Sequence, residues 1–354
     1  MTTDDRSLRP TDLDYRLPAA QIALRPSERR AGSRLLYLAA SGRFDDRIFG
    51  ELPELLLPGD LLVVNDVQVP PMRLYGNKES GARVELLLLP GFDERRAGAL
   101  LRCNGKLRVG EKILIGEEAN ALELVESLGR GAWTVCAPPG VPWSKLLQKH
   151  GKMPLPPYIE RRRAADDADR VRYQTVYARH GQASAAPTAG FHFDRELLEA
   201  LKTRGVEQES VCLQVGPGTF RPLDDELPLA EQALHSETWR IEPSVAAVVG
   251  AAVEQGRRIV AVGTTVLRTL EAWQMAGRPD DGEWRSTDVF LYPGKAPSFP
   301  LAALITNFHL PKSSLLALVC AFAGMGPVME AYRHAVHADY RFYSYGDAML
   351  VERA

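Results

Sequence analysis

The sequence lacks the features that mark several large classes of protein. It has only four cysteines in 354 residues, and they form neither a CxxC pair nor a metal-ligand spacing. Long apolar segments are also missing, because the first 20 residues are charged and the apolar run 315–323 is too short to span a bilayer. We therefore expect a reduced, cytoplasmic protein without a membrane segment.

Excess charge of one sign is likewise missing. The chain has 43 basic and 45 acidic residues, a formal net charge of −2, so the whole molecule carries no electrostatic footprint for nucleic acid. An RNA partner would have to meet a local patch. The triple arginine 161–163 is the best candidate, although short charge runs are usually solvated faces.

Several well-known active-site motifs do not occur. No GxGxxG follows an opening strand, and there is no GxxxxGK[ST], HExxH or GxSxG. Dinucleotide, P-loop, zinc-protease and α/β-hydrolase chemistry are therefore disfavoured, while spacing alone leaves a Ser/His/Asp triad open. No set of histidines, cysteines and carboxylates has ligand spacing, so we expect no metal.

The hydrophobic pattern divides the chain into a β-rich segment and flanking segments in which strand and helix patterns alternate. Six short β-rich runs separated by glycine turns lie between residues 69 and 139, which predicts a small barrel. Strand and helix patterns alternate on both sides. We expect a mixed α/β core domain, residues 1–68 and 151–354, with an inserted small all-β barrel domain, residues 69–150. The pattern also predicts a helix over 46–56 and a strand over 287–292.

Polar residues gather in loops that follow predicted strands, where open α/β sheets bind ligands. These loops are Gly263-Thr264-Thr265, the glycine loop 216–220, the small-residue run 184–190 entering His192, and Asn307-Phe308-His309 ahead of Lys312. His192, His235 and His309 each have an equally weighted interpretation as structural histidines. At loop ends they are candidates for proton transfer. The residues alone predict a two-domain enzyme with a polar crevice.

Several long motifs occur in order along nearly the whole chain. They include Pro58-Gly59-Asp60-Leu61-Leu62, Met153-Pro154-Leu155-Pro156-Pro157-Tyr158-Ile159, Pro187-Thr188-Ala189-Gly190-Phe191-His192-Phe193, Ile305-Thr306-Asn307-Phe308-His309-Leu310-Pro311-Lys312 and Tyr343-Ser344-Tyr345-Gly346-Asp347. By these motifs the chain resembles the S-adenosylmethionine:tRNA ribosyltransferase-isomerase family of queuosine biosynthesis.

The resemblance implies a reaction and a set of site residues. The family transfers and isomerises the ribosyl group of S-adenosylmethionine onto 7-aminomethyl-7-deazaguanine at the tRNA wobble position, giving epoxyqueuosine-tRNA, adenine and methionine. S-adenosylmethionine would be a cosubstrate, tRNA the partner, and we expect a monomer without a further cofactor. His192, His235 and His309 are the candidate catalytic residues. The candidate substrate-binding residues are Gly190, Gly218, Thr219, Glu237, Thr264, Thr265, Arg268, Asn307, Lys312, Tyr345 and Asp347.

The chain departs from the family pattern at a few motif positions. Val67-Gln68 stands where the family has threonine and arginine, Gln214 replaces a histidine, and Val266-Leu267 replaces serine and valine. Because polar groups are lost, two alternatives stay open. One is a family enzyme with a different acceptor, and the other is a non-catalytic paralogue that binds RNA. Glutamine can form hydrogen bonds but cannot shuttle a proton at neutral pH.

Overall fold

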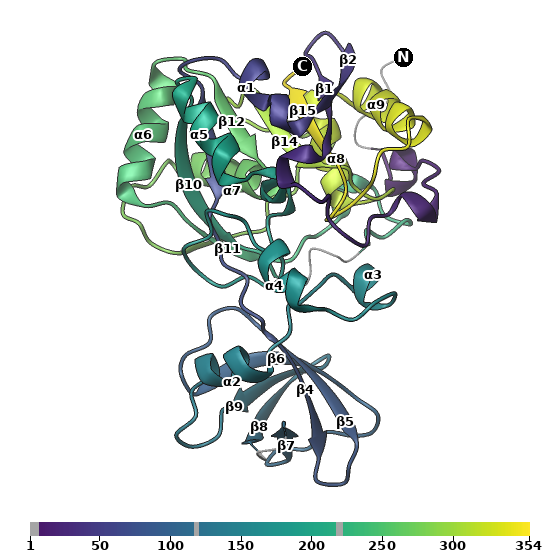
Figure 1. The fold of residues 1–354 in the computed structure, drawn as a ribbon, viewed down its shortest axis with the longest axis vertical. Coiled ribbons are helices and arrows are strands. Elements are labelled where there is room, and N and C mark those ends of the chain that lie inside the picture. Colours follow the sequence, from purple (N-terminus) through teal and green to yellow (C-terminus); the bar gives the residue numbers. More distant parts are fainter. Residues whose placement is uncertain (1–6, 117–119, 217–221) are drawn as a thin grey trace.

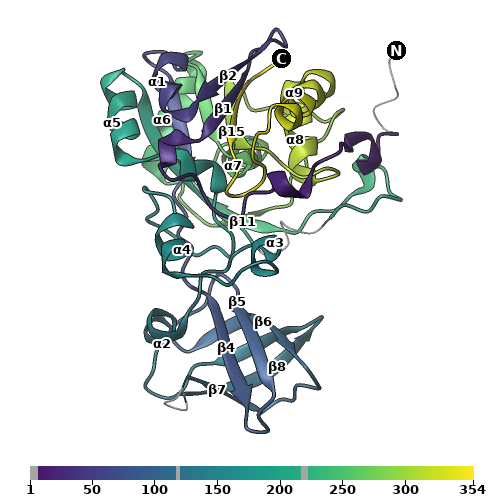
Figure 2. The same cartoon turned by 45° about the vertical axis from the view of Figure 1, so that its right-hand side comes forward.

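The computed structural model describes residues 7–116, 120–216 and 222–354. Figures 1 and 2 show an elongated molecule with a large α/β body at one end and a small β-barrel at the other. The short helices α3 (Pro157–Glu160) and α4 (Asp167–Arg172) lie between them. The predicted fold class, a mixed α/β core with a small all-β barrel, is confirmed. The domain boundaries placed at residues 69 and 150 stay a prediction.

The large sheet contains nine strands of the described chain in the order β13-β11-β10-β3-β12-β14-β15-β1-β2. Their bounds are β1 (Arg34–Leu38), β2 (Phe44–Ile48), β3 (Leu61–Asn65), β10 (Glu207–Gln214), β11 (Glu237–Arg240), β12 (Ile259–Val262), β13 (Arg285–Thr287), β14 (Ala303–Asn307) and β15 (Ala348–Glu352). The central strands β3, β12 and β14 are buried along their whole length, as expected of parallel strands covered on both faces.

Helices cover both faces of this sheet. Apolar side chains of α6, α7, α8 and α9 form one core cluster with Leu61 and Val63 of β3, and those of α1 and α5 form another with Leu62 and Val64. Successive side chains of β3 point to opposite faces of the sheet and therefore pack into two different cores. The bounds are α1 (Leu52–Leu55), α5 (Arg195–Thr203), α6 (Pro243–Glu254), α7 (Thr264–Met275), α8 (Ser314–Ala323) and α9 (Met325–His337).

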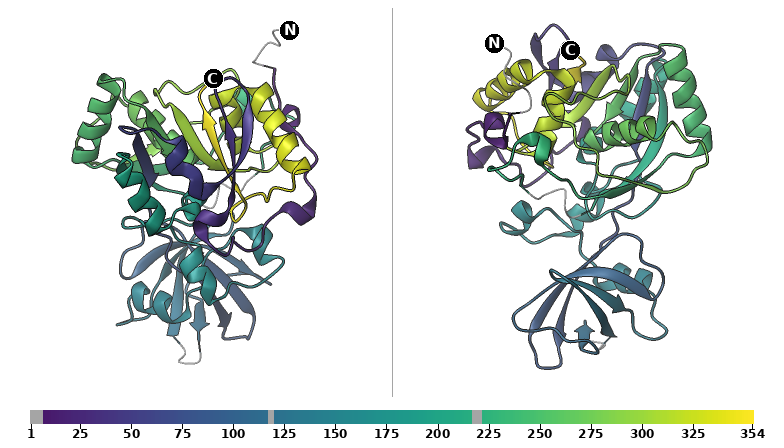
Figure 3. Two further views of the ribbon diagram at one scale, coloured as in Figure 1. Left: turned by 45° about the horizontal axis from the view of Figure 1, so that its top comes forward. Right: turned by 180° about the vertical axis from the view of Figure 1, so that it is seen from behind.

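Short 3₁₀ helices complete the body. They are η1 (Pro10–Leu13), η2 (Ala19–Gln21), η3 (Arg30–Gly32), η4 (Phe49–Glu51), η5 (Thr188–His192) and η7 (Leu229–Glu231). Figure 3 shows the same layers from two other sides. Among the helices, α5 begins at Arg195, because the Asp194 side chain accepts a hydrogen bond from Leu197 N at 2.9 Å and so caps it.

The barrel closes through the strand order β4-β5-β6-β9-β8-β7, all pairs being antiparallel. Its strands are β4 (Arg73–Lys78), β5 (Arg83–Leu88), β6 (Arg96–Cys103), β7 (Lys112–Ile115), β8 (Asn120–Gly129) and β9 (Ala132–Cys136), and α2 (Trp143–His150) follows them. Alternate residues fill the interior, for example Val84, Leu86 and Leu88 of β5.

The predicted helix over 46–56 is wrong. Residues 44–48 form β2, which pairs antiparallel with β1, and only 52–55 are α-helical. Pro53 explains the limit, since a proline lacks the N–H that a longer helix would need there but fits the first turn. The apolar spacing of Phe49, Leu52 and Leu56 is real, because all three are buried in one cluster.

The predicted strand over 287–292 is also wrong, because β13 ends at Thr287. The Thr287 hydroxyl accepts a hydrogen bond from Val289 N at 3.2 Å, and Val289 O accepts one from Arg268 Nε at 3.1 Å. These two bonds replace the ladder hydrogen bonds of a continuing strand. Residues 289–291 instead line a cavity.

Candidate active site

One edge of the large sheet collects the ends of several strands. β3, β10, β12 and β14 run parallel, so their carboxyl ends meet there. β13 ends at the same edge, because Thr287 pairs with Glu237 at the start of the antiparallel β11. β15 begins there, since Ala348 pairs with Asn307. This is the edge at which open α/β sheets bind ligands.

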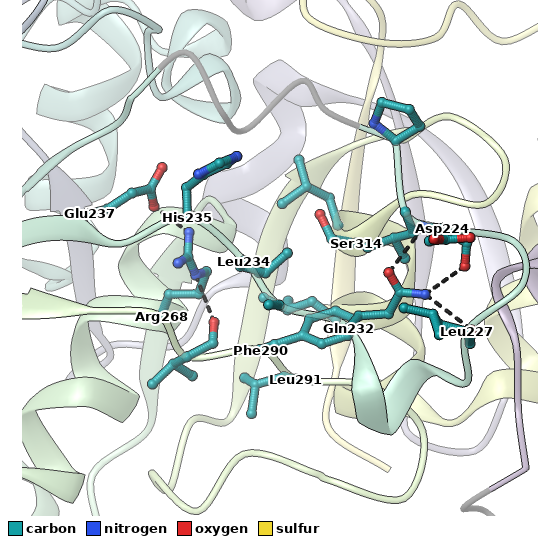
Figure 4. A pocket seen from close by; sticks show the side chains of 16 residues that line it. Asp224, Leu227, Gln232, Leu234, His235, Glu237, Arg268, Phe290, Leu291 and Ser314 are labelled. Carbon is teal, nitrogen blue, oxygen red and sulfur yellow. Dashed lines mark hydrogen bonds and ion pairs between the residues drawn. The ribbon is translucent and has the colours of Figure 1, made fainter. Parts of the chain in front are cut away.

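Three adjoining cavities form a crevice along this edge. The first cavity, about 310 Å³, is drawn in Figure 4; it is called the apolar cavity after its wall of Leu234, Phe290 and Leu291, and polar residues also line it, namely Asp224, Gln232, His235, Glu237, Arg268 and Ser314. The polar cavity, about 70 Å³, is lined by Thr188, Gly263, Thr264, Thr265, Arg268, Thr306, Asn307, His309 and Ser344 among others. The outer cavity, about 270 Å³, includes Asp225, His309 and Lys312. Leu315 lines all three, so they meet around its side chain.

Arg268 stands in the wall shared by the apolar and polar cavities. It is 5% exposed; its Nη1 is ion-paired with Glu237 and its Nε donates to Val289 O. Its Nη2 has no hydrogen-bond partner among the described residues. A buried guanidinium N–H without a partner is costly. It is therefore a preformed donor for an oxygen of a bound ligand.

The amino terminus of α7 faces the polar cavity. Gly263 precedes the helix with φ 95°, a left-handed conformation that favours glycine. Because glycine has no side chain, the N-cap residue forms no side-chain hydrogen bond to this end of the helix. Thr265 Oγ1 is buried without a partner in the described chain. Helix amino termini attract anions through their open N–H groups and dipole. Arg268 lies one turn further on the same helix and lines the polar cavity together with Thr264 and Thr265.

His309 separates the polar and outer cavities. Its Nε2 lies 2.9 Å from Thr306 Oγ1, and its backbone is fixed at both ends, since its N–H donates to Tyr332 Oη and its carbonyl accepts from Tyr15 Oη. Burial lowers its pKa to about 3. The imidazole is therefore neutral at physiological pH, the form in which a ring nitrogen can accept a proton.

His192 lies behind Asn307 and lines none of the three cavities. Its Nδ1 is 2.7 Å from Ser33 Oγ and its Nε2 is 3.2 Å from Asn307 Nδ2. Burial first, and then the charges of Arg341 and Arg30, lower its pKa to about 3. Both ring nitrogens are engaged, so this geometry fits a neutral histidine that orients Asn307. Its predicted role in proton transfer is untested.

Asn307 itself lines the polar cavity, and both atoms of its side-chain amide are held by hydrogen bonds. Its Nδ2 also donates to Tyr343 O at 3.2 Å, and its Oδ1 accepts from Thr188 Oγ1 at 3.2 Å. The amide thus links η5, the end of β14 and the segment before β15. Thr188, Tyr343 and Ser344 were not among the predicted site residues, although their motifs were recognised. Their place follows from β15 pairing antiparallel with β14, a pairing that the sequence does not reveal.

Two other predicted residues lie at the rim of the crevice. His235 is exposed and lines the apolar cavity beside Glu237 and Arg268, as Figure 4 shows. Lys312 lines the outer cavity and its Nζ lies 3.0 Å from Asp225 Oδ2 and 3.7 Å from Asp14 Oδ2. The hydrogen bond to Asp225 and the nearby carboxylates raise the Lys312 pKa.

Besides His192, three predicted residues lie outside these cavities. A Cβ on Gly190 would lie 2.1 Å from Tyr177 Oη, so tight packing explains this glycine. Tyr345 donates to Asp169 Oδ1 at 2.9 Å. Asp347 accepts hydrogen bonds from Arg341 N at 2.8 Å and Arg34 N at 3.1 Å, which fixes the turn before β15. Gly218 and Thr219 lie outside the described residues.

The departures from the family pattern also lie away from the three cavities. A Cβ on Gly181 would meet Gln214 Nε2 at 3.1 Å and Val67 Cγ2 at 3.4 Å, so these two substitutions sit together. Gln214 accepts a hydrogen bond from Thr238 Oγ1 at 3.2 Å. Val266 and Leu267 are buried in the apolar core. These changes therefore alter packing next to the crevice rather than its lining.

The triple arginine is only partly a free surface. Arg163 donates to both carboxylate oxygens of Asp169 at 2.7 Å and to Leu24 O at 2.9 Å, whereas Arg161 and Arg162 are exposed. Within the described chain no group of three or more histidine, cysteine or carboxylate side chains could hold a metal ion. Nor is any helix of that part long and apolar enough to cross a membrane.

Comparisons with known proteins agree with this architecture. A family model described as "Queuosine biosynthesis protein" matches residues 10–351. The S-adenosylmethionine:tRNA ribosyltransferase-isomerase of Acidithiobacillus ferrooxidans is 47% identical over 344 residues, covering 96% of this chain and 97% of that protein. The protein of the same name from Maricaulis maris is 42% identical, covering 98% and 99%. A crystal structure of S-adenosylmethionine tRNA ribosyltransferase from Thermotoga maritima superposes with a TM-score of 0.53 at 35% identity, covering 96% and 99%.

Proposed function

Because the chain belongs to the queuosine biosynthesis protein family, we propose that it is an S-adenosylmethionine:tRNA ribosyltransferase-isomerase, the activity in the names of its relatives. It transfers and isomerises the ribosyl group of S-adenosylmethionine onto 7-aminomethyl-7-deazaguanine at the tRNA wobble position. The products are epoxyqueuosine-tRNA, adenine and methionine. S-adenosylmethionine is a cosubstrate, and the protein works as a cytoplasmic monomer.

The observation that carries the site assignment is the unpartnered Nη2 of Arg268 between two cavities. We assign the methionine carboxylate of S-adenosylmethionine to this N–H, to the Thr265 hydroxyl and to the amino terminus of α7. A carboxylate accepts two or more hydrogen bonds and gains most from donors that are already fixed and desolvated. Glu237 contributes a carboxylate on the same wall, which offsets the positive sulfonium charge.

The apolar cavity suits the adenine. Phe290 and Leu291 provide flat and apolar surface, and its size of about 310 Å³ is in the range of ligand pockets. His235 at its rim is placed to give a hydrogen bond to the departing base. Since it is exposed, solvent reaches its ring.

His309 is assigned as the base that removes a proton from the sugar carbon beside sulfur. Its place between the polar and outer cavities supports this assignment, whereas the low pKa that burial gives it in the unbound protein makes it a weak base there. Asn307, which His192 orients, is assigned to a sugar hydroxyl or the acceptor base, since it presents an amide in a fixed direction. Lys312 is assigned to an RNA phosphate at the outer cavity.

Adenine release from S-adenosylmethionine tests the activity. The purified protein should release adenine with tRNA carrying the 7-aminomethyl-7-deazaguanine precursor and release none with unmodified tRNA. Release with neither RNA, despite binding of S-adenosylmethionine, would mean a different acceptor. Absence of binding as well would support a non-catalytic RNA-binding protein.

A further inference from the structure

A fourth cavity lies away from the crevice, where the barrel meets the α/β body. This junction cavity, about 390 Å³, is lined on the barrel side by residues of β4, β5 and β6 and by the turn between β8 and β9. On the other side are residues 154–160 and Ser184. None of the predicted site residues lines it, so the proposed activity does not yet use it.

The floor of the junction cavity is polar, and two of its hydrogen-bonding atoms have no partner among the described residues. Arg73 is 6% exposed; its Nη1 lies 2.5 Å from Glu85 Oε1 and is also ion-paired with Glu160. Its Nε is buried without a partner in the described part of the chain, and so is Ser184 Oγ, in a residue only 3% exposed. Buried polar atoms of this kind are rare in folded proteins and call for a ligand or water.

The two carboxylates share this arginine in a partly desolvated site. Burial first, and then the charge of Glu85, raise the pKa of Glu160 to about 7, although Arg73 opposes both effects. Near neutral pH the Glu160 carboxyl is therefore able to accept or donate a hydrogen bond. The floor as a whole offers donors from Arg73 and Ser184 and acceptors from Glu85 and Glu160.

The walls and the rim have a different character. Leu87, Leu100 and Leu155 supply apolar wall, while the exposed Arg102 and Arg130 stand at the barrel side. An apolar slot with donors and acceptors at its floor and cations at its edge matches one nucleotide. In such a site the base would fill the slot, its edge would meet the polar floor, and its phosphates would meet the arginines.

The position of the cavity relates it to the crevice. Ser184 lines the junction cavity, and the next residues, Ala185 and Ala186, line the polar cavity. A single strand of RNA that crosses this segment could place one base on each side of it. Proteins that read single-stranded RNA commonly bind splayed-out bases in separate pockets.

We propose that the junction cavity binds one unpaired base of the RNA substrate, next to the base that is modified in the crevice, and that Arg102 and Arg130 hold its phosphates. This rests on the proposed function, which supplies RNA as the partner. The barrel would then help to recognise a base that flanks the modified base, while the α/β body performs the chemistry.

The first test compares RNA binding by a rim variant and a matched control. Arg102→Gln with Arg130→Asn removes both charges, and asparagine tolerates the positive φ of 50° at position 130. Arg108→Gln removes an exposed barrel arginine that does not line the cavity. Affinity for precursor-bearing tRNA should fall about tenfold in the rim variant, and the slope of log K against log salt should flatten by roughly 1.4, about 0.7 per lost contact. The control should match wild type, and S-adenosylmethionine binding should be unchanged in both.

The second test asks whether a base enters the slot. Leu100→Trp fills the cavity, and anticodon stem-loop RNAs with an abasic nucleotide at each loop position identify the base that is bound. One abasic position should weaken binding to wild type by about tenfold yet leave binding to Leu100→Trp unchanged. Equal losses for both proteins at every position would overturn the proposal, as would rim and control variants that bind RNA alike.

These outcomes are separable from the activity. If wild type releases no adenine but its RNA affinity depends on the two arginines and one base, the proposed reaction fails and the junction cavity stands. If wild type is active and the rim and filled variants bind tRNA as it does, the reaction stands and the junction cavity has no role in RNA binding.

Discussion

At the residue scale, the candidate site contains a few buried groups whose hydrogen-bond partners are incomplete or unusual. Arg268 has three donor nitrogens, of which one is ion-paired, one bonds a backbone carbonyl and one is unpartnered among the described residues. His192 and His309 are both buried and held neutral. Sequence reasoning placed all three residues in one site but could not tell the two histidines apart. Their hydrogen-bond partners do so, since Ser33 and Asn307 occupy both nitrogens of His192.

Arg268→Lys tests the carboxylate assignment. Lysine keeps a positive charge beside Glu237 but lacks the fork geometry that provides Nη2. Loss of a charge-assisted hydrogen bond, about 1.5–3 kcal/mol, should weaken S-adenosylmethionine binding by about tenfold to a hundredfold. Calorimetry measures the affinity, and urea unfolding checks that the fold is kept. Wild-type affinity in a folded variant would rule out Arg268 as the carboxylate ligand.

His309→Gln tests the neutral, buried state of that histidine. The folded pKa of about 3 lies below the ordinary 6.5, so as pH falls below about 6.5 only the unfolded chain gains the proton and stability is lost. Between pH 7 and 5 the wild type should lose about 2 kcal/mol of unfolding free energy through this group. The variant should lack that part of the loss.

Urea unfolding at a series of pH values measures this difference. His337→Gln, which changes an exposed histidine at the end of α9, should leave the pH dependence as in wild type. A His309→Gln protein whose stability falls with pH as steeply as wild type would show that the imidazole is protonated in the folded state.

At the element scale, the site is made by strand ends rather than by any single motif. β12 leads into the loop of Gly263 and then α7, and β14 leads into Asn307. Those two were predictable because an apolar run followed by glycine or asparagine marks a strand end. β11 and β15 were not predictable. β11 is short, β15 lies late in the chain, and their antiparallel partners are distant in sequence. The two wrong elements failed for different reasons, because pairing with the adjacent β1 overrides the helical periodicity of 46–56, whereas side-chain hydrogen bonds end the strand after Thr287.

Gly190→Ala tests the role of η5 as a support. The added Cβ would lie 2.1 Å from the buried Tyr177 Oη, so η5 must move, at a cost of about 1–3 kcal/mol. Thr188 of η5 bonds Asn307, hence turnover should fall as well. Thermal unfolding and adenine release measure both effects.

Gly250→Ala is the matched control. It lies within α6, has open space around the new methyl group and should gain about 0.5–1 kcal/mol of stability with unchanged turnover. A Gly190→Ala protein as stable and active as this control would show that η5 does not need the close approach.

At the scale of the whole molecule, the α/β body and the barrel divide the task. The body carries the crevice to which we assign S-adenosylmethionine at the strand-end edge, and the barrel meets the body at the junction cavity with its cationic rim. The near-zero net charge of the chain fits this arrangement, because RNA would meet local arginines instead of a uniformly basic surface. The barrel was predictable from its glycine-separated strands, whereas the junction cavity was not, since it depends on how the two parts dock.

The fate of the ribosyl carbons is the most direct test of the proposed reaction. The protein is incubated with S-adenosylmethionine carrying carbon-13 in the ribose and with precursor-bearing tRNA, and the RNA is digested to nucleosides for mass spectrometry. We expect the labelled five-carbon unit to appear on the wobble nucleoside in step with the adenine released. Adenine without label in that nucleoside would contradict this expectation.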